Sequence, residues 1–288
     1  MLRMRAPAKL NLTLEIVGKR TDGYHDIASV MQTLDLCDEL YFEQADSLSL
    51  HCNVAALQCD DNLVLKAARL LQQECGYSRG ATISLHKGIY QDAGLGGGSS
   101  DAAVTLLTLN KLWSLNCNRD ELIKMAAEIG SDVPFFIEGG TCLVRGRGEQ
   151  LTALPDIQQS WFVLLIPCFW PPPGKTAMLY KMVSEEMYTG GQFSSSICSK
   201  LRLGESLEQL YLFNVFESAA FRAYPALESY WQIFEHVSGG DVHLAGSGPV
   251  IFKVLTQKEV ALALVEKLSA CSLRALAVPS LGRGELDY

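Results

Sequence analysis

The feature that most constrains this chain is the glycine-rich run GLGGGSS at residues 94–100. Because glycine has no Cβ, the backbone there can adopt left-handed conformations and approach another group closely. An apolar pattern typical of a helix follows and ends near Trp113. A glycine loop that leads into a helix presents free N–H groups at the positive end of the helix dipole. The run therefore predicts an anion site, most often one for phosphate, in preference to a flexible turn before a capped helix.

The common phosphate-binding motifs do not fit this run. A P-loop needs Gly-x-x-x-x-Gly-Lys-Ser/Thr, and Gly174-Lys175-Thr176 matches its end, but Phe169 stands where the first glycine is needed. The dinucleotide fingerprint fails because Ser99 occupies the position of its third glycine. The sequence also has no His-Arg-Asp or Asp-Phe-Gly motif of the protein kinases. The predicted phosphate site therefore belongs to another architecture.

Composition limits the classes of protein to which the chain can belong. Its 288 residues suit two compact domains or one large one, and 48% of them are hydrophobic, enough for a sizeable core. The net charge of −8 argues against a nucleic-acid partner, because phosphate backbones need a basic surplus. No apolar run reaches the roughly 18 residues of a membrane span, so we expect no membrane partner.

The cysteines indicate a cellular compartment. All 9 are scattered, without a Cys-x-x-Cys pair or a His/Cys cluster at zinc spacing, so we expect reduced thiols and no metal site built by the protein. Lys9 and Asn11 interrupt the first apolar stretch, which excludes a signal segment there. The expected location is cytoplasmic.

The N-terminal part combines strands and helices. Residues 6–17 alternate between apolar and polar positions, which predicts a half-buried strand with Lys9 and Asn11 on its polar face. Asn118 and Glu121 form a capping-box pattern for a helix that should end at Gly130. Further elements are expected as a loop at residues 18–25, strands at 27–36, 39–50 and 81–86, a helix at 62–75, and a helical turn at 131–136.

A composition break at residues 154–160 predicts two domains, at residues 1–158 and 159–288. A buried strand at 161–166, a proline-rich loop at 171–173 and a mostly helical stretch to about residue 237 should follow the break. Within that stretch, residues 189–206 are polar and predict a loop. The end of the chain alternates strand (242–245), turn (246–248), strand (250–255), helix (257–269) and strand (272–278), which indicates a small α+β sandwich.

Five short motifs, taken in order, resemble those of the GHMP (galactokinase, homoserine, mevalonate and phosphomevalonate) kinases. They are PAKLNL at residues 7–12, GYH at 23–25, the glycine loop, GSDVP at 130–134 and GSG at 246–248. The first, second and fourth resemble the branch that acts on a cytidine diphosphate-linked methylerythritol, in the non-mevalonate route to isoprenoids. The resemblance implies an α+β GHMP kinase fold, with an N-terminal ribosomal-protein-S5-domain-2-like α/β domain and a C-terminal ferredoxin-like α+β domain.

The resemblance also implies a reaction, the transfer of the γ-phosphate of ATP, with Mg²⁺, to the 2-hydroxyl of that substrate. Asp132 is the candidate base, and Lys9 would hold it and stabilise charge on the attacking oxygen. Composition alone leaves other interpretations open, because Asp132 could cap a helix and Lys9 could be a solvated lysine.

The other implied site residues fall into two sets. Ser99 or Ser100 would add a hydroxyl to phosphate or Mg²⁺. The expected nucleotide contacts are Asn62, Leu63, Lys87, Gly94, Leu95, Gly96, Gly97, Gly98, Ser99 and Ser100. The expected contacts of the phosphate acceptor are Asn11, Tyr24, His25 and Asp132, with Phe169 or Trp170 as a further face for the cytosine.

The sequence departs from the family pattern at two places. Asp92 puts a carboxylate just before the glycine loop, which is unfavourable for phosphate unless the side chain points away. Bulky residues at 169–173 replace the usual loop after the 161–166 strand. Two alternative functions stay open, another GHMP kinase of the mevalonate or homoserine type and a catalytically inactive nucleotide-binding regulator. An RNA-binding protein conflicts with the acidic surplus.

Overall fold

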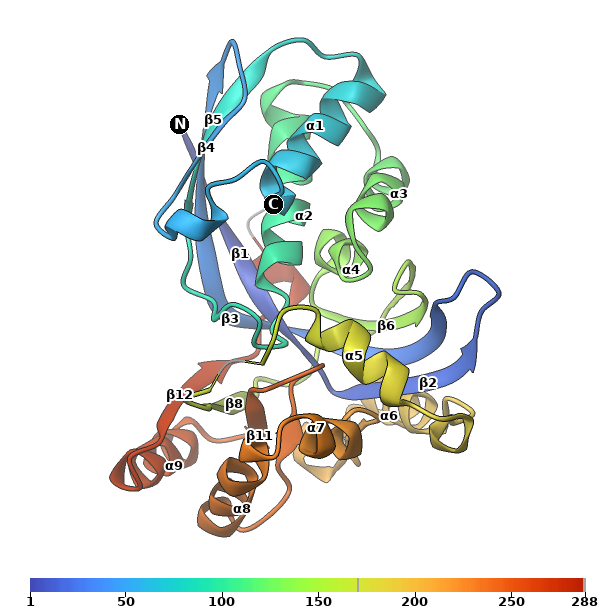
Figure 1. The fold of residues 1–288 in the computed structure, drawn as a ribbon, viewed down its shortest axis with the longest axis vertical. Coiled ribbons are helices and arrows are strands. Elements are labelled where there is room, and N and C mark those ends of the chain that lie inside the picture. Colours follow the sequence, from blue (N-terminus) through green and yellow to red (C-terminus); the bar gives the residue numbers. More distant parts are fainter. Residues whose placement is uncertain (170, 287–288) are drawn as a thin grey trace.

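The computed structural model describes residues 1–169 and 171–286. Two sheets, each covered by helices, follow one another along the chain (Figure 1). Within the described residues, no helix has both the length and the apolar character needed to cross a membrane.

One long strand organises the first sheet. β3 (His25–Ala45) pairs antiparallel with four others, which are β1 (Leu2–Asn11), β2 (Thr13–Lys19), β5 (Gly80–His86) and β6 (Thr141–Gly146). β4 (Ser49–Cys52) adds parallel to β5, and β7 (Gln150–Ala153) adds antiparallel to β6. The helices α1 (Leu63–Cys75), α2 (Gly97–Leu112), α3 (Arg119–Ile129) and α4 (Val133–Glu138) cover one face of this sheet (Figure 1). Their apolar sides bury the larger core cluster of the molecule.

The second sheet is built from the C-terminal half. Its strands are β8 (Trp161–Ile166), β10 (His243–Leu244), β11 (Ile251–Leu255) and β12 (Arg274–Pro279). They lie in the order β10-β11-β8-β12, with every pair antiparallel. This arrangement, with α8 (Ala226–Ser238) and α9 (Lys258–Ala270) packed together near it, is the predicted ferredoxin-like α+β unit (Figure 1).

The remaining elements are short helices, turns and one short strand. They are α5 (Lys175–Met182), α6 (Gln192–Arg202), β9 (Phe213–Asn214), α7 (Glu217–Ala223) and the 3₁₀ turns Ala55–Leu57, Glu185–Met187, Leu207–Gln209 and Arg283–Glu285. β9 pairs in parallel with β2, so the C-terminal half contributes one strand to the first sheet. The domain division near residue 158 stays a prediction.

Local signals in the sequence predicted the helix starts well. Asn62 caps α1 by accepting a hydrogen bond from the Val64 N–H at 2.9 Å. Asn118 and Glu121 form the expected capping box of α3, which ends at Gly130. Trp113, where the pattern of α2 was expected to end, is buried, and its indole N–H donates to the Gly80 carbonyl at 3.3 Å.

Four expectations about individual elements were wrong. The strand expected at residues 6–17 is interrupted at Leu12, while the one expected at 27–36 continues into the one expected at 39–50 as β3, which ends at Ala45 before β4 begins at Ser49. Asp101 follows the glycine loop directly and was expected in the first turn of the next helix, but it lies beyond that turn because α2 already begins at Gly97. The polar face of the first strand is buried, not half-exposed, since α2 and α6 pack against β1 and β2.

The segment predicted as a polar loop at residues 189–206 contains helix α6. Its start is fixed by a distant acid, because the buried Glu15 carboxylate accepts from the Ser194 N–H at 2.7 Å and from Thr189 Oγ1 at 2.7 Å. The apolar residues Ile197 and Leu201 then face the core. A run of serines hides this helix in the sequence, since the stabilising contacts come from β2.

Candidate active site

Lys9 reaches the centre of the molecule from strand β1. The pairing of β1 with β3 shifts between Pro7 and Ala8, where Pro7 has no N–H for the ladder. Beyond this irregularity, the Lys9 backbone N–H donates to the Leu95 carbonyl at 2.9 Å. The strand and the glycine loop are therefore joined directly at Lys9.

The glycine loop packs too tightly for side chains at two positions. Gly94 has φ +82, and a Cβ there would lie 1.9 Å from the Ala245 carbonyl oxygen. Gly96 has φ +74, and a Cβ there would lie 2.9 Å from Lys9 Cγ. Both positions require glycine, because their φ is positive and because no room is left for a Cβ. The 246–248 turn therefore packs against the glycine loop, because Ala245 directly precedes that turn.

Lys9 and Asp132 meet across the site. Lys9 Nζ lies 3.3 Å from Asp132 Oδ2, with side chains 5% and 41% exposed respectively. Lys9 Nζ also donates to Asn11 Oδ1 at 2.7 Å, and the Asn11 amide donates to Ser29 Oγ at 2.8 Å. Asp132 precedes α4 but makes no side-chain capping bond. Its carboxylate is therefore accessible and oriented by a buried lysine, and the capping alternative does not describe it.

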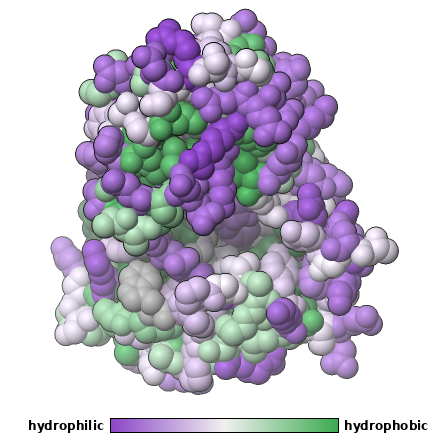
Figure 2. Space-filling view, turned by 45° about the horizontal axis from the view of Figure 1, so that its top comes forward, coloured by the Kyte–Doolittle hydropathy of each residue, from purple (hydrophilic) through white to green (hydrophobic). Residues whose placement is uncertain are grey.

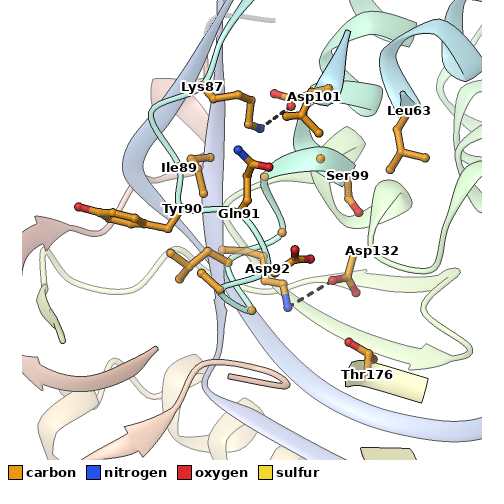
Figure 3. Close-up of a pocket in the computed structure, with 18 of the residues that line it drawn as sticks. Leu63, Lys87, Ile89, Tyr90, Gln91, Asp92, Ser99, Asp101, Asp132 and Thr176 are labelled. Carbon is orange, nitrogen blue, oxygen red and sulfur yellow. Dashed lines mark hydrogen bonds and ion pairs between the residues drawn. The ribbon is translucent and has the colours of Figure 1, made fainter. Parts of the chain in front are cut away.

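A cavity of about 490 Å³ lies over the glycine loop. Figure 3 shows Ser99, Asp92 and Asp132 with their side chains converging on one part of it. Of the predicted nucleotide contacts, its wall contains Asn62, Leu63, Lys87, Gly94, Leu95, Gly96, Gly97, Gly98 and Ser99, together with Lys9 and Asp132. The structure thus places Asp92 in the wall of the cavity, where its charge faces any bound phosphate.

Lys87, in the wall of this cavity, belongs to a buried cluster of charged side chains. Its ammonium contacts Asp38 and lies 2.6 Å from Asp101 Oδ2. Burial alone would lower the pKa of Lys87, but the two carboxylates outweigh it and raise the pKa above its usual value. Burial raises the pKa of Asp101 to about 8, and the neighbouring Asp38 charge acts in the same direction. Two carboxylates and one ammonium carry one surplus negative charge. A proton held by one of the two carboxylates neutralises it.

A second cavity, of about 900 Å³, lies beside the first. Tyr24 and His25 line it, as do Tyr180 and Tyr188, and the His25 ring stacks on Tyr180 with centroids 5.2 Å apart. Burial lowers the pKa of His25, and the nearby Lys19 lowers it further. Cationic side chains are also present in the wall, namely Lys19, Arg147 and Lys181. An aromatic, partly basic cavity suits a ligand with a flat ring and negative charge.

The two cavities share three residues, Ser99, Asp132 and Thr176. The accessible Asp132 carboxylate therefore stands where a ligand in one cavity would meet a ligand in the other. The space-filling view shows a hollow on this face of the molecule, with hydrophilic and hydrophobic side chains mixed around it (Figure 2). The arrangement can bring two molecules together beside one carboxylate.

Some predicted site residues lie outside both cavity walls. Asn11 is buried, and its amide is occupied by Lys9 and Ser29. Ser100 is buried beneath the glycine loop, and its hydroxyl has no hydrogen-bond partner among the described residues. Phe169 packs near Tyr224 and Tyr230, so it does not offer a face to the second cavity. Trp170 lies outside the described residues.

Sequence reasoning missed several wall residues. Lys175 and Thr176 line the first cavity and contact the Ser247 hydroxyl, each at 2.9 Å. Both appeared only as the tail of a rejected P-loop, and in the structure they open helix α5, outside the glycine loop. Tyr180, four residues further along α5, follows Thr176 by one helical turn, and this spacing was the available signal.

The comparisons with known proteins agree with this geometry. The family model for the GHMP kinases N terminal domain matches residues 62–140. The chain is 41% identical over 283 residues to a 4-diphosphocytidyl-2-C-methyl-D-erythritol kinase of Dehalococcoides mccartyi, covering 98% of this chain and 99% of the relative. The chain belongs to the 4-diphosphocytidyl-2-C-methyl-D-erythritol kinase family. A member of this family from Syntrophus aciditrophicus is 36% identical over 263 residues, covering 91% of this chain and 92% of the relative.

Solved structures confirm the predicted GHMP kinase fold. A crystal structure of a 4-(cytidine 5'-diphospho)-2C-methyl-D-erythritol kinase matches with a TM-score of 0.81 and 32% identity, covering 98% of this chain and 100% of that one. A homoserine kinase from Cytophaga hutchinsonii matches with a TM-score of 0.75 at 17% identity, covering 98% and 94%. The second likeness concerns the fold alone. Within the superfamily, membership in the 4-diphosphocytidyl-2-C-methyl-D-erythritol kinase family rests on the full-length sequence matches.

Proposed function

We propose that the protein transfers the γ-phosphate of ATP to the 2-hydroxyl of 4-diphosphocytidyl-2-C-methyl-D-erythritol. The observation that carries the proposal is the junction of the two cavities at Asp132, beside Lys9. ATP would occupy the cavity over the glycine loop, and the acceptor would occupy the aromatic one. The names of the full-length relatives support this choice of acceptor.

Asp132 is the proposed base. Its carboxylate takes the proton of the 2-hydroxyl while that oxygen bonds to the γ-phosphorus, and the bond from this phosphorus to the β-phosphate oxygen breaks to release ADP. Lys9 holds Asp132 in place and supplies positive charge near the attacking oxygen. Backbone N–H groups of the glycine loop and of the start of α2 hold the phosphates.

An oxygen ligand for Mg²⁺ is available beside the glycine loop. Among the described residues, no group of three or more His, Cys, Asp or Glu side chains is suited to hold a metal ion. Mg²⁺ is often bound by few protein oxygens together with substrate phosphates, and the cavity-lining Ser99 hydroxyl fits that role. Held by this serine and the phosphates, the ion would neutralise phosphate charge.

Acceptor recognition rests on the second cavity. Tyr24, His25 and Tyr180 would contact the cytosine, and Arg147 lies near enough to Tyr24 for its guanidinium carbon to be 4.9 Å from that ring. A positive side chain there suits the diphosphate of the acceptor. We also propose that the protein works in the cytoplasm, which its free cysteines support.

The test is a panel of single acceptors with purified protein and Mg-ATP. We expect ADP formation with 4-diphosphocytidyl-2-C-methyl-D-erythritol and less than about one hundredth of that kcat/KM with mevalonate or homoserine, since the aromatic cavity contributes nothing to small acceptors. Turnover of mevalonate or homoserine in place of the cytidyl compound would overturn the proposed acceptor. Nucleotide binding without turnover of any acceptor would instead support an inactive regulator.

A further inference from the structure

Lys175 is a buried lysine that the mechanism above does not use. It opens helix α5 after Gly174, whose φ of +78 turns the chain into the helix. The residue is only 6% exposed, yet it lines the cavity over the glycine loop. A lysine is rarely buried so far without a partner of opposite charge.

The neighbours of Lys175 hold its ammonium without neutralising it. The Nζ donates to Ser247 Oγ at 2.9 Å and to the Gly248 carbonyl, both in the turn that packs against the glycine loop. Throughout the described chain, no carboxylate lies within 4.0 Å of this nitrogen, whereas Lys9 has Asp132 and Lys87 has two acids. An ammonium has three N–H donors, so one is left for a ligand in the cavity.

The charges around Lys175 come from three other elements. Asp92 lies in the loop before α2, Lys9 on β1 and Asp132 before α4, and all three line the same cavity. Burial lowers the pKa of Lys175 to about 8; Asp92 opposes this shift and Lys9 adds to it. A buried cation beside Lys9, with no ion-pair partner of its own, is most stable when an anion enters the cavity.

We propose that Lys175 is a catalytic residue whose ammonium binds the phosphoryl group as it passes from ATP to the acceptor. Thr176, the next residue, lies at the junction of the two cavities, which puts Lys175 beside the path of transfer. Its charge also offsets that of Asp92, which would otherwise repel the phosphates. This inference rests on the proposed function, because it assigns a role within the same transfer.

The first test compares nucleotides in the absence of acceptor, by titration calorimetry. In Lys175→Met, we expect adenylyl imidodiphosphate, which carries a γ-phosphate, to bind about 10- to 100-fold more weakly, and ADP to bind within about 2-fold of wild type. Lys267→Met, an exposed lysine on α9, is the matched control and should change neither affinity. Equal losses for both nucleotides would show a purely structural lysine, and no loss for either would also overturn the proposal.

The second test uses Lys175→Arg, which keeps the charge at all accessible pH values. In wild type, kcat/KM for ATP should fall as pH rises above about 8, because the ammonium loses its proton. The arginine variant should lack this fall, and the same fall in both proteins would overturn the proposal. This comparison also decides the matter if Lys175→Met does not fold. Failure of every acceptor to turn over would refute the proposed function, while the nucleotide titrations would still test Lys175.

Discussion

Lys9 Nζ and Asp132 Oδ2 lie 3.3 Å apart, one on a buried strand and the other at the accessible junction of two cavities. The lysine is fixed from both ends, since its backbone N–H is bonded to Leu95 and its ammonium to Asn11. The carboxylate that it holds is free to contact a ligand. A general base needs both properties, a rigid group that holds it in place and a carboxylate oxygen that is open to the substrate.

Replacing Asp132 by asparagine should remove the proton acceptor and keep the shape. We expect kcat to fall by about 10²- to 10⁴-fold, with the affinity for ATP changed by less than about 3-fold. Steady-state kinetics and nucleotide titration measure the two effects separately. The control is Asp46→Asn, an exposed aspartate paired with Arg79 at 3.7 Å. A kcat for Asp132→Asn near that of the control would show that Asp132 is not the base.

The glycine loop allows a matched pair of alanine substitutions. A Cβ at Gly94 would meet the Ala245 carbonyl at 1.9 Å, but one at Gly98 would lie 3.7 Å from the nearest atom, Leu63 Cδ1. Gly94→Ala should therefore lower the free energy of unfolding by more than about 2 kcal/mol. Gly98→Ala should change it by less than about 1 kcal/mol, because it lies in the helix. Urea denaturation compares the two, and equal effects would contradict the close packing at Gly94.

The buried cluster of Lys87, Asp38 and Asp101 makes a stability prediction. Lys87→Met leaves two buried acids without their cation and should lower the free energy of unfolding by about 3–5 kcal/mol. The control Lys200→Met removes an exposed ion pair with Glu205 and should cost less than about 1 kcal/mol. Chemical denaturation at neutral pH measures both. A loss for Lys87→Met no larger than the control would refute the role of the cluster.

The same cluster predicts a pH dependence of stability. The pKa of Asp101 is raised from 3.8 to about 8, so the folded protein holds a proton there that the unfolded chain releases. The stability that this proton adds is fully present below pH 3.8, the unfolded pKa of Asp101. It is lost as the pH rises toward about 8, the pKa in the folded protein. Between about pH 5 and pH 7, wild type should lose up to about 1.4 kcal/mol per pH unit more than Asp101→Asn. Parallel stability curves would contradict a proton held by the cluster.

The sequence predicted the elements whose causes are local. The glycine loop, the Asn62 cap and the Asn118–Glu121 capping box all depend on residues within a few positions of one another. Helix α6 escaped prediction because its start is held by Glu15, which is distant in the sequence. Strands β6 and β7 were not predicted, because β6 forms by pairing with the distant β3 and β7 forms by pairing with β6.

The site, like the fold, was predicted where its residues lie in recognisable local motifs and missed where they depend on distant contacts. Motif resemblance placed Lys9, Asp132 and the glycine loop in one site, and the structure brings them together. Lys175 was missed because its importance depends on burial beside Ser247, which no local pattern records. Asn11 supports Lys9 from within the core and lines neither cavity, and its predicted contact with the acceptor stays a prediction.

Transfer across the junction at Asp132 should put the phosphate on one particular oxygen of the acceptor, and the position of the phosphate in the product can be measured. Wild-type protein is incubated with Mg-ATP and 4-diphosphocytidyl-2-C-methyl-D-erythritol labelled with ¹³C at C2, and the product is examined by ³¹P NMR. We expect a new phosphate monoester coupled to C2, formed in equal amount to ADP, and formed at least about 100-fold more slowly with Asp132→Asn. Inorganic phosphate alone, or a monoester at another hydroxyl, would contradict this expectation.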